Sequence, residues 1–209
     1  MRTSILRLAA LLLVCLLLAA CTGDGLIRLK YEDGKFVNAS KKLSYIPAPV
    51  SYEPTSVGEA YAYYERGNIT MYEISGVSPT LWLTEEYADT ATTVFYSDTI
   101  TLPTLADFGA ERIYACVSEE RTYVEFTIED ASLIASIVEL TENGEAAEEP
   151  MGDLLLSYDM KFSSPAWPMI YINLEYEEYE DGAYLYNRNT RKYTALGDLL
   201  TEIVHEGES

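Results

Sequence analysis

Cysteine and histidine, the residues that most often carry nucleophilic or metal chemistry, are scarce in this chain. Its 209 residues include three cysteines and one histidine, His205. Transition-metal sites need several imidazole or thiolate ligands at set spacings, and the sequence has neither a histidine pair nor a Cys-x-x-Cys motif. A Ser–His–Asp triad would have to use His205, which stands beside a polar tail. We therefore assign no catalytic residue, no cofactor and no metal, and favour a protein that is not an enzyme.

Carboxylates, in contrast, are abundant. Five of them crowd a predicted strand end and turn: Glu175, Glu177, Glu178, Glu180 and Asp181. Hard oxygen ligands at such a place could bind calcium, but the spacing matches no EF-hand loop, and we favour a solvated acidic edge that discourages strand-to-strand aggregation. Glycoside hydrolysis needs two carboxyls at a defined separation across a cleft, which a count of acids neither excludes nor assigns. A carboxylate-dependent hydrolase of an extracellular polymer therefore stays as an alternative.

Aromatic side chains offer a second kind of recognition chemistry. The chain has 18 tyrosines, and Trp167 lies between Pro165 and Pro168, close to Tyr171. Exposed rings on a β scaffold can stack on sugar rings or grip a protein partner. Tyrosine is also a good strand former, so ordinary cross-strand packing is the alternative. Trp167 and Tyr171 are the candidate ligand contacts.

The N-terminal stretch decides where this chemistry takes place. Arg2 and Arg7 supply a positive start, and an apolar run from Leu8 to Leu18 leads to small residues and Cys21. This order is typical of a secretory signal. The run is too short to cross a bilayer core of about 30 Å, which takes about 20 helical residues.

The residues Leu18-Ala19-Ala20-Cys21 resemble the lipobox of bacterial lipoproteins. The resemblance implies that residues 1–20 are removed as a signal peptide and that the Cys21 thiol is linked to a diacylglycerol, with palmitate-type acyl chains as the anchor. It places the protein at the cell membrane, lipid-anchored and facing the outside of the cytoplasm. An ordinary signal peptide that ends in cysteine and a retained membrane anchor are the alternatives. We recognise no functional family for the mature chain.

Charge limits the partners. The whole chain has a net charge of −20, and loss of Arg2 and Arg7 with the signal leaves −22. Phosphate backbones and anionic lipid headgroups repel such a surface, so we exclude nucleic acid as a partner. The membrane must then be held by the acyl chains on Cys21, and two chains suffice for stable anchoring.

Cys116 is the remaining thiol, because Cys15 leaves with the signal and Cys21 is acylated. No disulfide within the chain can form, so the fold must hold by packing alone. A nucleophilic role for Cys116 would need a partner histidine. We expect it instead to be a small buried hydrophobe on a strand.

The elements that must position these residues are mostly strands. We expect residues 21–25 to be a lipidated N-terminus and short tether, and 26–209 to be a single β-rich domain, with 144–152 as the place for a subdomain break. The class is α+β: mostly antiparallel, twisted sheet of about eight to ten strands, in one or two layers. One amphipathic helix, about 130–142, and a short C-terminal helix complete it.

The predicted helix 130–142 has the clearest boundaries. Asp130 is placed to cap its start, and Asn143-Gly144 to end it. Its apolar stripe consists of Leu133, Ile134, Ile137, Val138 and Leu140. The C-terminal helix is expected over Asp198 to Val204. Near Leu81 and Trp82 the pattern leaves a short helix and a strand both open.

Together these features predict a lipid-anchored cell-envelope protein that binds a protein or a glycan without catalysing a reaction. The alternatives are the hydrolase and a purely structural envelope component. Binding predicts an exposed aromatic patch without a deep pocket. The hydrolase predicts a cleft with two facing acids and raised pKa values.

Overall fold

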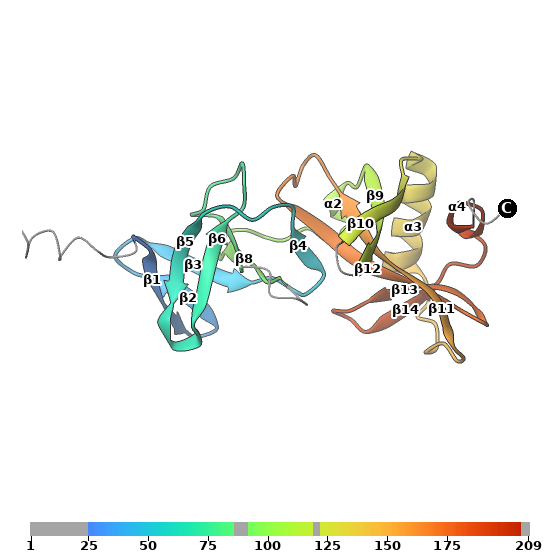
Figure 1. The fold of residues 1–209 in the computed structure, drawn as a ribbon, viewed down its shortest axis with the longest axis horizontal. Coiled ribbons are helices and arrows are strands. Elements are labelled where there is room, and N and C mark those ends of the chain that lie inside the picture. The colour runs from blue at the N-terminus through green and yellow to red at the C-terminus, as the bar shows by residue number, and fades with distance from the viewer. Residues whose placement is uncertain (1–24, 86–91, 119–121, 206–209) are drawn as a thin grey trace, which may run out of the picture.

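The fold is rich in β-structure and has few helices. The computed structural model describes residues 25–85, 92–118 and 122–205, which contain fourteen strands and three α-helices. The strands form two sheets, with the first at one end of the molecule and the second, together with the helices, at the other (Figure 1). The predicted signal peptide and Cys21 lie outside the described residues.

The first sheet is a closed barrel of seven strands. In spatial order these are β1 (Ile27–Glu32), β2 (Lys35–Asn38), β3 (Leu43–Pro47), β8 (Val94–Ser97), β7 (Trp82–Glu85), β6 (Ile69–Glu73) and β5 (Ala60–Tyr64). β1 closes the ring by pairing in parallel with β5, Leu29 opposite Tyr64, and every other pair among the described strands is antiparallel. The prediction of a β-rich, mostly antiparallel fold is confirmed, but this half of the chain closes into a barrel and is not simply a twisted sheet.

Side chains fill the barrel. Its eight buried core residues are Leu29, Phe36, Leu43, Tyr45, Ala62, Met71, Leu83 and Phe95. A barrel of this strand number has an interior just wide enough for side chains. Phe36 meets Phe95 edge to face at 5.2 Å, and the buried Tyr45 hydroxyl donates to the Pro79 carbonyl oxygen at 2.8 Å. The barrel interior is therefore packed protein core.

The second sheet has seven strands. Its spatial order is β10 (Thr122–Ile128), β9 (Arg112–Ser118), β11 (Leu154–Ser163), β12 (Ile170–Tyr179), β13 (Gly182–Asn187) and β14 (Lys192–Ala195), with β4 (Tyr52–Pro54) also paired to β12. Together the two sheets contain fourteen strands, more than the eight to ten that the sequence predicted. Sequence alternation shows which face of a strand is buried but not where the chain closes a barrel.

Helices cover one face of the second sheet, called here the inner face. They are α3 (Ala131–Asn143), α2 (Leu105–Phe108) and α4 (Thr201–Val204). Ile134 and Ile137 of α3 and Phe108 of α2 share a core with alternate residues of β9, β11 and β12. On β11 and β12 these are Tyr158, Met160, Phe162, Ile170, Ile172, Leu174 and Tyr176. The residues between them therefore face the other side, called here the outer face.

The main helix has the predicted boundaries. The Asp130 side chain accepts a hydrogen bond from the Leu133 backbone N–H at 2.8 Å, and the Gly144 N–H returns to the Leu140 carbonyl. A Cβ on Gly144 would collide with that same carbonyl oxygen, so the helix ends on a residue without one. The expected C-terminal helix is shorter than predicted and begins at Thr201.

The barrel and the second sheet share a core. Trp82, for which the sequence left a helix and a strand open, lies on barrel strand β7. With Val94 of β8 it belongs to the same hydrophobic core as the buried residues of the second sheet. Its ring meets Trp167 edge to face at 6.2 Å. The two sheets are therefore joined by packed aromatic side chains as well as by the chain itself.

Candidate functional site

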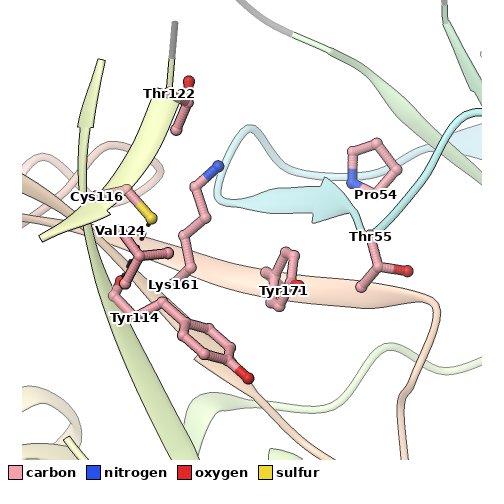
Figure 2. Close-up of a pocket in the computed structure, with 8 residues that line it drawn as sticks. All are labelled: Pro54, Thr55, Tyr114, Cys116, Thr122, Val124, Lys161 and Tyr171. Carbon is pink, nitrogen blue, oxygen red and sulfur yellow. Dashed lines mark hydrogen bonds between the residues drawn. The ribbon is translucent and has the colours of Figure 1, made fainter. Parts of the chain in front are cut away.

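The outer face of the second sheet carries half-buried tyrosines together with charged side chains. At one end is an open hollow of about 440 Å³ lined by Tyr114, Cys116, Val124, Lys161, Tyr171 and Pro54, among others. The Tyr114 and Tyr171 rings meet edge to face at 6.1 Å. Figure 2 shows Lys161 rising from β11 between Cys116 on one side and Tyr171 with Pro54 on the other.

Lys161 joins the hollow to a polar network. Its Nζ lies 2.7 Å from Glu53 Oε2, and both side chains are largely buried. Glu53 comes from β4, which pairs with β12 opposite Tyr171. The other Glu53 oxygen accepts a hydrogen bond from Asn173 Nδ2 at 2.7 Å. The short strand β4 therefore places one carboxylate across the middle of the outer face.

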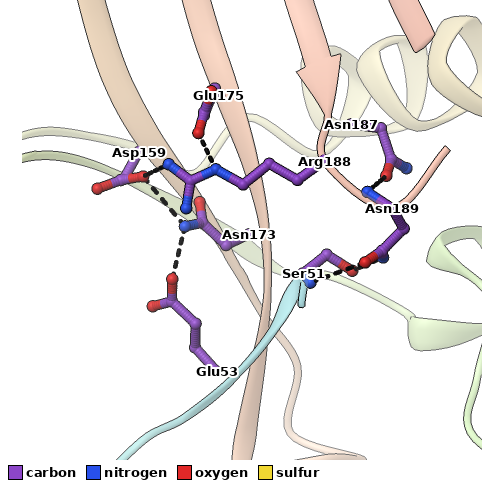
Figure 3. A network of polar contacts seen from close by, with 8 residues as sticks. All are labelled: Ser51, Glu53, Asp159, Asn173, Glu175, Asn187, Arg188 and Asn189. Carbon is purple, nitrogen blue, oxygen red and sulfur yellow. Dashed lines mark hydrogen bonds and ion pairs between the residues drawn. The ribbon is translucent and has the colours of Figure 1, made fainter. Parts of the chain in front are cut away.

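Asn173 lies at the centre of this network, and only 4% of its surface is exposed. Its Nδ2 also donates to Asp159 Oδ1 at 3.1 Å (Figure 3). Arg188 approaches the same oxygen at 3.6 Å and contacts Glu175 Oε1 through its Nε. Among the described residues, Asn173 Oδ1 is the one buried side-chain oxygen or nitrogen that has no hydrogen-bond partner.

The turn that carries Arg188 is tied to the start of β4. The Asn189 amide oxygen accepts from the Ser51 N–H at 3.2 Å, and its Nδ2 donates to the Ser51 hydroxyl. Within the turn, Asn187 Oδ1 accepts from the Asn189 N–H at 2.9 Å. These contacts hold the turn's backbone while the Arg188 side chain extends over β12 (Figure 3).

Four tyrosines line the far end of the outer face. Tyr193 meets Tyr186 at 4.7 Å and Tyr184 at 6.2 Å, and Tyr184 meets Tyr179 at 6.2 Å. The Tyr179 hydroxyl donates to Glu177 Oε2 at 2.7 Å, and this bond, with burial, raises the Tyr179 pKa well above its usual range. The Tyr179 phenol therefore stays neutral, and the four side chains present rings and hydroxyls on this face.

Of the two aromatic residues predicted as ligand contacts, Tyr171 lines the hollow on the outer face. Trp167 lies half-buried at the joint between the sheets, against Trp82. The structure therefore does not bring the two predicted residues into one site. Cys21, the predicted lipidation site, lies outside the described residues.

Cys116 and His205 lie on opposite faces of the sheet. Cys116 faces outward with 4% of its surface exposed, and burial raises the pKa of its thiol. His205 Nε2 lies 3.2 Å from Glu178. Because Glu177, the preceding residue on β12, faces outward, Glu178 and its contact with His205 lie on the inner side. A buried thiol with a raised pKa holds little of the nucleophilic thiolate form.

The acidic run 175–181 is divided between the two faces. Glu175 and Glu177 point outward and Glu178 inward. β12 lies between β11 and β13, so the run is not the sheet edge that the sequence suggested. In the described part of the chain, no group of three or more His, Cys, Asp or Glu side chains is arranged to hold a metal ion.

The residues that sequence reasoning missed are Tyr114, Lys161, Asn173 and Arg188. The alternation of β11 and β12 indicates that residues 161 and 173 point away from the core. Nothing in the sequence indicates that β4 and the turn after β13 cover residue 173.

No helix within the described ranges is long and apolar enough to cross a membrane. No protein-family model, curated protein or solved structure matches the chain.

Proposed function

We propose that this chain is a lipid-anchored protein of the bacterial cell envelope that binds a protein or a glycan on the outer face of its second sheet, without catalysing a reaction. Acyl chains on Cys21 attach it to the membrane, facing the outside of the cytoplasm. The lipobox-like residues 18–21 support the attachment, and the net charge of −22 after signal removal supports a lipid anchor over a basic membrane-binding patch.

The observation that carries the binding role is the hollow around Tyr171. Two tyrosine rings, an exposed valine and a lysine ammonium surround an open space rather than a deep cleft. Rings offer stacking and apolar contact, while a small number of placed polar groups fix a ligand's orientation. This combination fits recognition of an extended ligand that lies along the sheet.

A carboxylate-dependent hydrolase is supported less well. Such an enzyme needs an acid and a second carboxylate facing each other across a substrate cleft. The carboxylates of the outer face instead contact cations and an amide: Glu53 contacts Lys161 and Asn173, and Glu175 contacts Arg188. A purely structural envelope component would require no defined binding residues on this face, so the arrangement of side chains around the hollow favours a binding protein.

Binding is tested with the full chain reconstituted in lipid vesicles and incubated with purified cell-wall glycan or with envelope protein extract. Tyr171→Ala should lose at least about tenfold in affinity for the bound component, because an aromatic anchor at the centre of an interface contributes more than its neighbours. Tyr31→Ala is the matched control, since Tyr31 is an exposed tyrosine on the barrel. Equal binding by both variants would overturn the proposed site.

Attachment is tested by labelling. Cells that express the wild-type chain should incorporate labelled palmitate into it, whereas Cys21→Ser should incorporate none. A wild-type chain that takes up no label would overturn the lipid anchor.

A further inference from the structure

Two acids stand side by side on the outer face. Asp159 on β11 and Glu175 on β12 are direct cross-strand partners, so their carboxylates extend from neighbouring positions on the same face. Like charges in this relation repel each other unless a cation lies between them. Arg188 supplies that cation from the turn after β13.

Arg188 fills this position incompletely. Its guanidinium contacts Glu175 through Nε but lies 3.6 Å from Asp159, beyond hydrogen-bond distance. A well-fitted arginine binds carboxylates through two parallel hydrogen bonds. The Arg188 side chain is 41% exposed, and the turn's own contacts run through Asn187 and Asn189. The side chain can therefore rotate into solvent while the turn keeps its place.

An unused acceptor lies at the same position. Asn173 is 96% buried, and its Nδ2 donates to the same Asp159 oxygen that Arg188 approaches, while its Oδ1 has no hydrogen-bond partner among the described residues. A buried acceptor without a donor is costly. A cationic group that contacts Asp159 and Glu175 and also donates to Asn173 Oδ1 would satisfy this acceptor.

The neighbouring side chains suit a peptide cation. Tyr186 is the cross-strand partner of Glu175 on β13, where its ring can face a cation. On the other side, the hollow between Tyr114 and Tyr171 is lined by aromatic and aliphatic groups that suit an apolar side chain. The strongly negative chain attracts positive partners and repels acidic polymers.

We propose that the ligand of the outer face is a basic peptide segment of a protein partner, and that an arginine or lysine of this segment replaces Arg188 between Asp159 and Glu175, with an adjacent apolar residue in the hollow beside Tyr171. This inference rests on the proposed binding function and specifies its ligand. Arg188 then acts as an internal competitor that occupies the position until the partner arrives.

The internal competitor gives a test in which removing a positive charge strengthens binding. The probe is an acetylated tri-arginine peptide, titrated into the full chain in lipid vesicles and followed by calorimetry. Arg188→Ala should bind it about tenfold more tightly than the wild type, because the variant no longer has to vacate the position first. Asp159→Asn should bind it at least about tenfold more weakly.

Arg191→Ala is the matched control, because it removes the same charge from the same turn at a residue for which the structure shows no contact with Asp159 or Glu175. It should leave the affinity near the wild-type value. Arg188→Gln keeps hydrogen-bond donors but loses the charge, so it should also bind the tri-arginine peptide more tightly than the wild type. It replaces Arg188→Ala in the test if the alanine variant folds poorly. A tri-citrulline peptide, of similar shape but uncharged, should bind neither wild type nor variants.

Equal affinities for Arg188→Ala and Arg191→Ala, or equal binding of tri-arginine and tri-citrulline, would overturn the proposal. These outcomes are distinct from failure of the binding function itself. If cell-wall glycan binds in a way that depends on Tyr171 but not on Arg188 or Asp159, the binding function stands and the peptide ligand is wrong. If Tyr171→Ala binds every component as the wild type does, the proposed binding function fails.

Discussion

Asp159 and Glu175 face each other across β11 and β12, and the fold holds these two negative charges together through a residue from a third element. Arg188 contacts both carboxylates, and Asn173 donates to Asp159 from below. The polar network of the outer face therefore joins several elements of the chain. Its members come from β4, β11, β12 and the turn after β13.

Replacement of Arg188 by alanine should lower the free energy of unfolding by about 1 kcal/mol, because the two facing carboxylates lose their common cation while solvent still screens them. Urea denaturation followed by circular dichroism measures the change. The double variant Arg188→Ala with Asp159→Asn should regain most of the loss, since only one charge then remains of the opposed pair. A single variant as stable as the wild type would contradict this account.

Replacement of Asn173 by alanine should cost more, about 2 to 3 kcal/mol, because it removes two hydrogen bonds to carboxylates from a buried site. Asn143→Ala is the control of the same type, since Asn143 is exposed and bonds Glu139 on α3. Chemical denaturation of both variants gives the comparison. Equal decreases in the free energy of unfolding for the two variants would show that the buried position of Asn173 does not make its hydrogen bonds more stabilising.

The sequence predicted the elements of this fold better than their connections. The Asp130 cap, the apolar stripe of α3 and the alternation of β11 and β12 are local patterns, and each predicted its element correctly. The barrel depends on a parallel pairing of β1 with β5, between segments that are distant in the chain. Alternation carries no information about such a pairing.

The candidate site was less predictable for a related reason. Tyr171 is an aromatic residue near a proline-bounded loop, which made it a predicted ligand contact, and it lines the hollow. Trp167 has the same local signature but packs against Trp82, a contact between two sheets that no local pattern reveals. Asn173 has an ordinary outward-facing position in the sequence. In the fold, β4 and the turn after β13 cover it.

Loss of the α3 cap should destabilise the chain by about 1 kcal/mol in Asp130→Ala, because the Leu133 N–H loses its acceptor at the helix start. Asp130→Asn retains a side-chain oxygen at the same place and should remain near the wild-type stability. Thermal unfolding of the three proteins measures the difference. An asparagine variant as unstable as the alanine variant would contradict a capping role.

Alkaline pH should destabilise the fold through its buried tyrosines. Burial raises the pKa of Tyr45 and of Tyr176, and the Tyr176 hydroxyl also donates to Glu178. A pKa that is higher in the folded chain than the unfolded value of about 10 gives stability that is fully present below pH 10 and is lost as the pH rises further. Tyr176→Phe should therefore weaken the dependence of the free energy of unfolding on pH above 10. Full tyrosinate absorbance near pH 10 from a chain that is still folded would contradict the raised pKa values.

The shared core at Trp82 and Trp167 predicts that the barrel and the second sheet unfold together. Trp167→Ala should lower the free energy of unfolding by about 2 to 3 kcal/mol, because it removes a large half-buried ring from that core. Trp82, on a barrel strand, is then the chain's one remaining tryptophan, and its fluorescence reports on the joint while far-ultraviolet circular dichroism reports on both sheets. The two signals should change at the same urea concentration, as a single cooperative transition requires. Trp167→Phe, which keeps an aromatic ring against Trp82, should lose less stability, and two separated transitions in the wild type would show that the sheets are independent.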